Sequence, residues 1–353
     1  MKELEQILQL WAQAERDGEG AVLATVVKTH GSSYRLPGAR LLLTASGRRA
    51  GSVSGGCLEQ ELIKKAWWFT EHGPVVRRYD TTPDGEIAAE YGLGCNGIIH
   101  VLLERLAPGK PNVLDVIRDV RSQRRSTSVA HFIAPASAVG QRVTIESDED
   151  SALSQLQADG EVFVETLVPA VHLLVFGAGE DAVPLVDLAK ALGWQVSVFD
   201  GRTHYARRDK FPTADEVLVR PAGESAAELG IDPWTVAVLM SHSYSQDLEN
   251  LRELAAQPLR YLGILGPRKR TAQLLEEAGW EDAQILSSIH SPMGLDIGAD
   301  GPEQVALAAI AEIQAVLNGR QGGLLRERAG SIHAPEEEPG DPARAWVRSI
   351  ACA

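Results

Sequence analysis

Two patterns of hydrophobic and polar positions divide the chain near residue 170. The first half begins with apolar side chains that recur at three- and four-residue spacing, which predicts an amphipathic helix with one buried face. The residues on that face are Leu4, Ile7, Leu8 and Trp11. The segment 21–31 follows and is rich in β-branched residues, which favour a strand. The chain is therefore predicted to open with a helix followed by a strand.

The remainder of the first half, up to residue 169, combines short apolar segments with turns of glycine and serine. Clusters of these small residues between apolar runs predict loops, and the clearest two are 51–56 (GSVSGG) and 91–97 (YGLGCNG). A mixed α/β domain over residues 1–169 is the simplest interpretation. The apolar patterns predict strands at 41–46, 98–106, 128–132, 142–145 and 161–166, and helices at 57–69 and 113–121.

From residue 171 onward, predicted strands and helices alternate. A strand at 171–176, predicted to be buried, precedes a glycine turn, a helix and a second strand that ends at Asp200. Strands separated by helices pair in parallel through right-handed crossovers, which predicts a doubly wound α/β domain over residues 170–325. Residues 326–353 are rich in Gly, Pro, Glu and Arg and are expected to form a peripheral tail. Further strands are predicted at 215–219, 235–241 and 260–266, and helices at 244–256 and 268–279.

Composition narrows the class of protein. The chain has 34 Lys and Arg against 48 Asp and Glu, and its net charge of −14 argues against a protein that coats nucleic acid or an anionic membrane surface. An apolar fraction of 44% allows a sizeable core. No run of about 18 apolar residues is present, so no membrane span is expected. The charged N-terminal helix does not resemble a signal peptide, and three cysteines do not make a disulfide framework, so we expect a cytoplasmic protein.

A glycine-rich turn follows the first apolar strand of the second half. Gly177, Gly179 and Ala182 form the pattern G-x-G-x-x-A at the start of a helix, as in dinucleotide-binding Rossmann folds. The first glycine permits a sharp turn, the second lets a pyrophosphate approach the backbone, and the helix N-terminus favours an anion. Asp200 ends the next strand, where an acidic side chain can bind a ribose hydroxyl pair.

Neighbouring residues leave the ligand of this turn open. Glu180 and Asp181 place two carboxylates beside the phosphate position, where they repel an anion unless they face away. The alternative is a turn that serves strand–helix packing alone. His242, in the string Ser-His-Ser at 241–243, and the basic string GPRKR at 266–270 follow predicted strands, where doubly wound sheets bind ligands. Their alternatives are an exposed histidine beside a capping serine, and a solvated basic first turn.

Two cysteines lie in or beside the glycine-rich loops of the first half. Cys57 follows the loop 51–56 at a predicted helix N-terminus, where the helix dipole favours the thiolate, and the loop can form a nest of N–H groups for an oxyanion. Cys95 stands in the second loop. A pair of thiols in such loops suits a soft metal centre or a sulfur-bearing cofactor. The alternative is that both are small buried hydrophobes, and a structural zinc site is not expected because the chain has no C-x-x-C pair.

Taken together, these blocks resemble the XdhC/CoxI family of xanthine dehydrogenase accessory factors, from the first helix to about residue 330. Two strings are specific, namely S-G-G-C-L-E at 54–59 and P-M-G-L-D-I-G-A at 292–299. The resemblance implies an N-terminal XdhC/CoxI-type mixed α/β domain and a C-terminal doubly wound Rossmann domain. The other shared blocks are G-S-S at 31–33, P-G-A at 37–39, G-L-G-C at 92–95, the Rossmann turn and G-I-L-G at 263–266.

The function that this resemblance implies is that of a non-catalytic maturation factor. Such a chaperone binds the molybdopterin cofactor, assists its sulfuration and inserts it into a xanthine dehydrogenase-type molybdenum hydroxylase. The implied partners are the apo-hydroxylase and a cysteine desulfurase. The implied cofactor contacts are Ser54, Gly55, Gly56, Cys57, Gly94 and Cys95, with Cys57 and Cys95 facing the molybdenum. In the Rossmann half, Gly177, Gly179, Asp200 and His242 would hold NAD(P), another nucleotide or the phosphate end of the cofactor.

Two positions depart from the family pattern. Many relatives carry a histidine after the second Rossmann glycine, where this chain has Glu180, and this difference weakens the case for nicotinamide binding. Tyr34 stands in a Ser-Ser-Tyr-Arg string where Ser-Ser-Pro-Arg is more usual, a change expected only to relax a turn.

Other classes of function stay open. An NAD(P)-dependent oxidoreductase would use the Rossmann turn with Asp200, and His242 as a proton donor. A protein interaction module would keep the turn without a ligand. A Cys–His nucleophile with His30 or His100 is a further hypothesis that spacing does not decide, and Cys352 has no assigned role. A homodimer is the default expectation.

Overall fold

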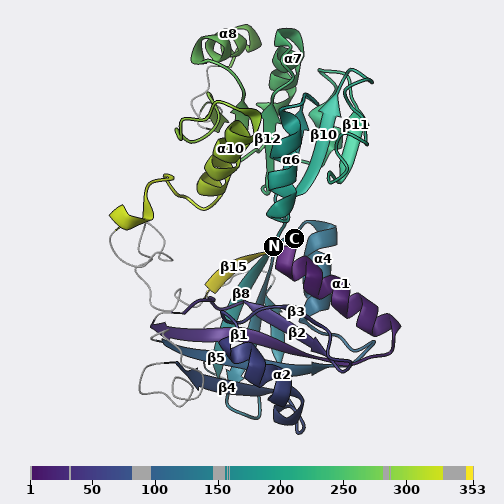
Figure 1. The fold of residues 1–353 in the computed structure, drawn as a ribbon, viewed down its shortest axis with the longest axis vertical. Coiled ribbons are helices and arrows are strands. Elements are labelled where there is room, and N and C mark those ends of the chain that lie inside the picture. The colour runs from purple at the N-terminus through teal and green to yellow at the C-terminus, as the bar shows by residue number, and fades with distance from the viewer. Residues whose placement is uncertain are drawn as a thin grey trace. The chain divides into compact units, whose positions relative to one another are not determined.

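The computed structural model describes residues 2–31, 33–81, 97–145, 160–280, 288–328 and 347–352, together with positions 156, 158 and 286. The chain divides into two compact units, which are coloured along the chain in Figure 1. Residues 1–169 and 339–353 form the first unit, and residues 170–338 form the second. Each unit combines β-sheets with helices.

The first unit contains a five-stranded antiparallel sheet in the order β3-β2-β1-β5-β4. Its central strand β1 pairs with β2 on one side and with β5 on the other, so that β3 and β4 form the edges. The bounds are β1 (Ala21–Gly31), β2 (Arg40–Thr44), β3 (Arg49–Gly51), β4 (Val75–Asp80) and β5 (Gly97–Leu106). The short edge strands β3 and β4 are additions to the elements expected from the sequence.

Apolar side chains cover both faces of β1, because successive residues of a strand point to opposite sides of the sheet. Val22 and Val26 lie in one core with α2 (Cys57–Phe69), whereas Leu23 lies in another with α1 (Lys2–Arg16). The predicted apolar stripe of α1 is buried in this second core through Leu4, Ile7, Leu8 and Trp11. Strand β1 is therefore the centre of the first unit.

A second sheet, in the order β15-β8-β6-β7, completes the first unit. β6 (Thr127–Ala134) pairs antiparallel with β7 (Arg142–Ile145) and with β8 (Glu161–Pro169), and α4 (Val113–Gln123) contacts β8. The edge strand β15 (Val347–Cys352) pairs in parallel with β8. Backbone pairing thus places part of the segment expected to be a peripheral tail in the sheet of the first unit.

A buried charge cluster joins the two sheets of the first unit. The guanidinium of Arg40 on β2 forms an ion pair with Glu165 on β8, and Glu165 Oε1 lies 2.9 Å from His131 Nε2 on β6. All three side chains are buried. Burial raises the pKa of Glu165, but Arg40 and His131 outweigh this effect and lower the pKa to about 2. Glu165 is therefore a charged group whose burial depends on its partners.

The second unit contains a six-stranded parallel sheet in the order β11-β10-β9-β12-β13-β14. Counted within the unit, this order is 3-2-1-4-5-6, the arrangement of the doubly wound Rossmann fold. The predicted fold class is therefore confirmed. The bounds are β9 (His172–Phe176), β10 (Gln195–Asp200), β11 (Glu216–Val219), β12 (Thr235–Leu239), β13 (Leu262–Ile264) and β14 (Ile289–His290).

Helices of the second unit connect and cover the parallel strands. The longest of them, α10 (Pro302–Leu317), was not among the elements expected from the sequence; it has a proline in its first turn and contacts α6. None of the helices in the described ranges is long and apolar enough to cross a membrane. The remaining bounds are α6 (Ala182–Ala191), α7 (Tyr244–Leu254) and α8 (Arg268–Ala278), with short 3-10 helices η1 (Ala226–Leu229) and η2 (Leu325–Glu327).

Candidate functional site

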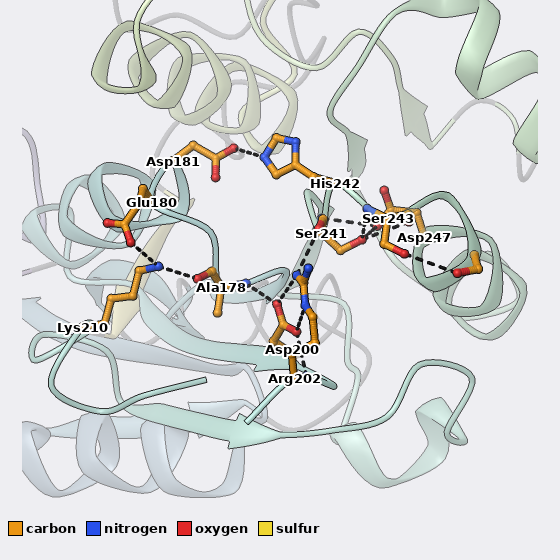
Figure 2. A network of polar contacts seen from close by, with 11 residues as sticks. Ala178, Glu180, Asp181, Asp200, Arg202, Lys210, Ser241, His242, Ser243 and Asp247 are labelled. Atoms are coloured by element: carbon orange, nitrogen blue, oxygen red, sulfur yellow. Dashed lines mark hydrogen bonds and ion pairs between the residues drawn. The ribbon is translucent and has the colours of Figure 1, made fainter. Parts of the chain in front are cut away.

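The Rossmann turn lies where β9 and β12 end next to each other, at the point where the strand order reverses. Gly177 has a φ of 122°, and a Cβ at this residue would lie 2.4 Å from the carbonyl oxygen of Met240. Only glycine fits so close an approach. The predicted turn is therefore present, and it brings the start of α6 close to the residues that follow β12 (Figure 2).

Asp200 anchors this turn from the end of β10. Its carboxylate accepts hydrogen bonds from the backbone N–H of Ala178 at 3.0 Å and from the Arg202 backbone N–H, Nε and Nη2 at 2.9, 2.8 and 2.8 Å (Figure 2). Burial raises the pKa of Asp200, but the bonds from Arg202 and Ala178 outweigh it and lower the pKa. A carboxylate has about four acceptor positions. Asp200 therefore uses its acceptors within the chain and offers none to a ribose.

The two carboxylates of the turn point in different directions (Figure 2). Glu180 is exposed and forms an ion pair of 2.8 Å with Lys210. Asp181 instead lies over the turn, because its Oδ1 is 2.4 Å from the position that a Cβ of Gly179 would take. The space in which a Rossmann fold receives a pyrophosphate thus contains the Asp181 carboxylate. Of the two carboxylates, Glu180 therefore faces away from the phosphate position, whereas Asp181 lies where it would repel an anion.

His242 completes this arrangement after β12. Its Nε2 lies 2.7 Å from Asp181 Oδ2, and its backbone has a φ of 57°, a left-handed conformation that is uncommon outside glycine. The Ser241 hydroxyl next to it donates a 2.6 Å hydrogen bond to Asp247, which is also ion-paired with Arg270. The Arg270 side chain of the basic string at 266–270 is therefore engaged in an internal ion pair.

In the first unit, the loop before α2 is organised around Glu59. Its Oε1 accepts hydrogen bonds from the backbone N–H groups of Val53 and Ser54 at 3.1 and 2.8 Å, and its Oε2 accepts one from Gly56 N–H at 3.1 Å. The Ser52 hydroxyl also donates to Glu59, at 2.9 Å. Burial raises the pKa of Glu59, but the hydrogen bonds from the Ser54 hydroxyl, the Ser54 N–H and the Ser52 hydroxyl outweigh it and lower the pKa. The nest of N–H groups expected to seat a phosphate is thus filled by the protein's own carboxylate.

A polar groove of about 730 Å³ opens beside this loop. Its lining includes Tyr34 and Arg35 from the segment between β1 and β2, and Arg49 from β3. Tyr34 is 69% exposed, and its ring lies 3.7 Å from the position that a Cβ of Gly55 would take. The other lining residues are Gln6, Leu41, Ala50, Gly51, Ser52, Ser54, Gly55, Gly56, Glu59 and Gln60.

Of the two cysteines expected to contact a cofactor, the described residues include Cys57 but not Cys95. Cys57 is the first residue of α2, directly after the groove-lining Gly55 and Gly56, as predicted. Gly94 and Cys95 lie outside the described residues. His30 and His100 come together on β1 and β5 with ring centres 6.0 Å apart. Among the residues that the structure describes, no group of three or more His, Cys, Asp and Glu side chains could hold a metal ion.

No role in this site is predicted from the sequence for Tyr34, Arg49 or Glu59. A signal for Glu59 is present in the sequence, because an acidic residue three positions after a helix N-cap forms one half of a capping box. Here the N-cap is Gly56, which has no side chain, and the Ser54 hydroxyl accepts the 3.1 Å hydrogen bond from Leu58 N–H instead. No pattern in the sequence distinguishes Arg49 from its neighbour Arg48.

Comparison with known proteins agrees with this two-unit architecture. Residues 14–80 match the XdhC and CoxI family, and residues 173–313 match the XdhC Rossmann domain. Over 317 residues the chain is 33% identical to a protein of Bacillus subtilis that is named as a probable subunit of xanthine dehydrogenase, and the alignment covers 84% of this chain and 93% of the relative. The chain belongs to the XdhC and CoxI family. The resemblance seen in the sequence is thereby confirmed.

Two further proteins are similar to this chain over most of its length. The chain is 27% identical to the molybdenum cofactor insertion chaperone PaoD of Escherichia coli, over 88% of this chain and 87% of that protein. A crystal structure of a xanthine dehydrogenase from Bacillus halodurans has a TM-score of 0.77 and 31% identity, and the match covers 91% of this chain and 97% of that one. The likeness therefore includes both units.

Proposed function

We propose that this chain is a maturation chaperone that binds the molybdopterin cofactor and inserts it into a xanthine dehydrogenase-type molybdenum hydroxylase. Relatives support the class of function, because one is named as a probable subunit of xanthine dehydrogenase and another as a molybdenum cofactor insertion chaperone. The observation that carries the proposal is the polar groove of about 730 Å³ that opens beside the loop leading into Cys57.

The groove fits such a cargo in size and in chemistry. Small-molecule sites commonly have volumes of about 300–1,000 Å³. Arg49 offers a guanidinium group for a phosphate, Gln6 and Gln60 offer amides for the polar edge of a pterin, and Tyr34 offers an aromatic face. Cys57 follows the groove-lining Gly55 and Gly56 in the sequence, and a cysteine thiolate suits a soft metal. The donor set therefore matches a ligand that carries a phosphate, a planar ring system and a metal–sulfur centre.

Within this proposal Cys57 and Cys95 face the molybdenum of the cargo. Glu59 holds the loop before Cys57 in one conformation, so that the loop keeps its shape when the cargo leaves. Ser54 shapes the loop through its bonds to Glu59 and Leu58, while Gly55 and Gly56 line the groove. The contacts that the family resemblance implies, and that this proposal keeps, are Ser54, Gly55, Gly56, Cys57, Gly94 and Cys95.

The second unit supports a role other than nicotinamide chemistry. Asp200 is fully engaged by Ala178 and Arg202, and Asp181 lies over the turn. A dinucleotide would meet a negative charge at its pyrophosphate and find no free acid for its ribose. We therefore assign Gly177, Gly179 and Asp200 to the conformation of the turn. His242 is 61% exposed, and it remains the side chain of this turn that can contact a ligand or partner.

The proposal extends to partners and assembly. The chaperone would hold the cofactor while its terminal sulfur ligand is installed, with a cysteine desulfurase as the sulfur donor and the apo-hydroxylase as the recipient. We propose that it acts in the cytoplasm, where thiols stay reduced, and as a homodimer.

Transfer of the cargo tests this function. The full chain is loaded anaerobically with molybdopterin cofactor, freed of unbound cofactor, and mixed with the apo-hydroxylase that its host produces. The expected result is hydroxylase activity that grows with the amount of loaded chain and exceeds that from the same quantity of free cofactor. Cys57→Ala should lower this transfer, and Cys352→Ala serves as the matched control. Equal activation by loaded chain and free cofactor would contradict the proposal.

A further inference from the structure

The adjacent residues Arg48 and Arg49 of the first unit have different partners. Arg48 is held by Asp17 and Glu19, with ion pairs of 3.0 and 2.5 Å. Arg49 is exposed, lines the groove beside Cys57, and has no ion pair with any residue in the described ranges. The chain carries a net charge of −14, so Arg49 places a positive charge in the groove of a protein that is negatively charged as a whole.

The other charged groups of the groove are already engaged. Arg35 is ion-paired with Glu3, and both side chains are partly exposed. Glu59 takes the N–H groups of Val53, Ser54 and Gly56, so these backbone donors are not available to an external anion. Among the described residues that line the groove, Arg49 is therefore the cation without a partner in the chain, and we assign an anionic ligand to its side chain.

Tyr34 adds a flat apolar surface to the same groove. Its ring lies against Gly55 at the loop and is 69% exposed, an unusual exposure for a large aromatic side chain. An aromatic face beside an arginine suits a ligand that combines a planar heterocycle with a phosphate group. Neither Tyr34 nor Arg49 is among the cofactor contacts that the family resemblance implies.

We propose that Arg49 binds the phosphate of the pterin cargo and that the Tyr34 ring stacks on its planar ring system. This inference rests on the proposed function and specifies which side chains recognise the cargo. Arginine forms two parallel charge-assisted hydrogen bonds to a phosphate, whereas lysine offers a single point charge. Arg49→Lys therefore keeps part of the affinity, and Arg49→Gln loses most of it.

The test measures binding and not hydroxylase activity. Molybdopterin cofactor released anaerobically from a purified molybdenum hydroxylase is titrated into the full chain, and the bound fraction is determined from the fluorescence of its oxidised pterin after rapid filtration. We expect Arg49→Gln to raise Kd by about 10- to 100-fold, since a lost charged hydrogen bond has effects of this order. Arg48→Gln is the matched control and should leave Kd within about twofold.

Two further measurements separate the parts of the inference. Tyr34→Ala should raise Kd by about five- to tenfold and Tyr34→Phe should leave it unchanged, because stacking requires the ring and not the hydroxyl. Inorganic pyrophosphate should compete with the cofactor in the wild type and lose this effect in Arg49→Gln. A melting temperature close to that of the wild type shows that each variant is folded.

The outcomes distinguish this inference from the proposed function. If the wild type binds and Arg49→Gln binds equally well, or if Arg48→Gln weakens binding as much as Arg49→Gln, the assignment of the phosphate to Arg49 is wrong while the chaperone function stands. If Tyr34→Ala binds as tightly as the wild type, the stacking role is wrong. If the wild type binds no cofactor, the proposed function itself fails.

Discussion

The Glu59 carboxylate on the first turn of α2 accepts a 2.8 Å hydrogen bond from the backbone N–H of Ser54, five residues earlier in the chain. Together with bonds from Val53 and Gly56, it places a negative charge inside a loop whose backbone would otherwise attract an external anion. The loop before Cys57 is therefore already ordered by the protein itself. Recognition of an anionic cargo falls to side chains around the groove.

Glu59→Gln should loosen this loop. The amide keeps one acceptor oxygen but brings an NH2 group toward backbone donors, which leaves buried N–H groups without partners. We expect a loss of about 1–3 kcal/mol in the free energy of unfolding, measured in urea, and a lower cofactor content. Glu61→Gln on the same helix is the control, because Glu61 contacts only Lys65, at 3.4 Å, among the ion pairs of the described residues. Equal stability of Glu59→Gln and the wild type would contradict this role.

The Arg40–Glu165 pair makes stability depend on pH. The pKa of Glu165 is about 2 in the folded chain and about 4.3 in an unfolded one. Because the folded-state pKa is the lower, the stabilisation is present above about pH 4.3 and is lost as the pH falls toward 2. Glu165→Gln leaves Arg40 without its counter-charge and should cost about 3–5 kcal/mol at pH 7.

The pH dependence is checked by urea unfolding of the wild type and Glu165→Gln at pH 7, 5 and 3. The difference between the two proteins should be similar at pH 7 and 5 and smaller at pH 3. A difference that stays constant over the whole range would show that the charge of Glu165 does not set it.

Asp181 should exclude dinucleotides from the Rossmann turn. NADH binding is measured by NADH fluorescence, and we expect no saturable binding below about 1 mM for the wild type. Asp181→Ala should bind at least about tenfold more tightly, because a like charge is removed from the phosphate position. Glu180→Ala is the control, since that carboxylate faces Lys210. Micromolar binding by the wild type would favour the oxidoreductase hypothesis instead.

Gly177 and Gly179 should respond differently to alanine. A Cβ at Gly177 meets the backbone of Met240, and its φ of 122° is strained for any other residue, so Gly177→Ala should destabilise the second unit by about 2–4 kcal/mol. A Cβ at Gly179 clashes with the carboxylate of Asp181, which can move aside, and meets His242 Cδ2 at an ordinary contact distance of 3.7 Å. Calorimetric unfolding of the full chain compares the two variants, and similar melting of both would be evidence against this account of the turn.

The fold could be predicted where a pattern is local and long. The bounds of α2 agree with the predicted helix 57–69 and those of β1 with the predicted strand 21–31, because each carries its full hydrophobic pattern within one segment. Strand β4 is half exposed and contains Arg77 and Arg78, so its polar sequence gives little strand signal. Strand β15 depends on pairing with β8, nearly two hundred residues away, and local sequence does not encode such a partner.

The candidate site was only partly accessible to sequence reasoning. The positions of Cys57 and Gly177 follow from spacing and turn chemistry. The use of Asp200 and Glu59 as internal acceptors depends on where Arg202 and the loop N–H groups lie in three dimensions. Likewise, the different surroundings of Arg48 and Arg49 are set by the packing of α1 and β3 and not by any motif.

Cofactor content shows whether the chain carries molybdopterin. The full chain is produced in a host that makes molybdopterin, purified anaerobically, and assayed for oxidised pterin and molybdenum beside a Cys57→Ala, Cys95→Ala double variant and a Cys352→Ala control. We expect close to stoichiometric pterin in the wild type and the control, and a strong loss in the double variant. Absence of pterin from all three proteins, together with saturable NADH binding by the wild type, would overturn the proposed chaperone function.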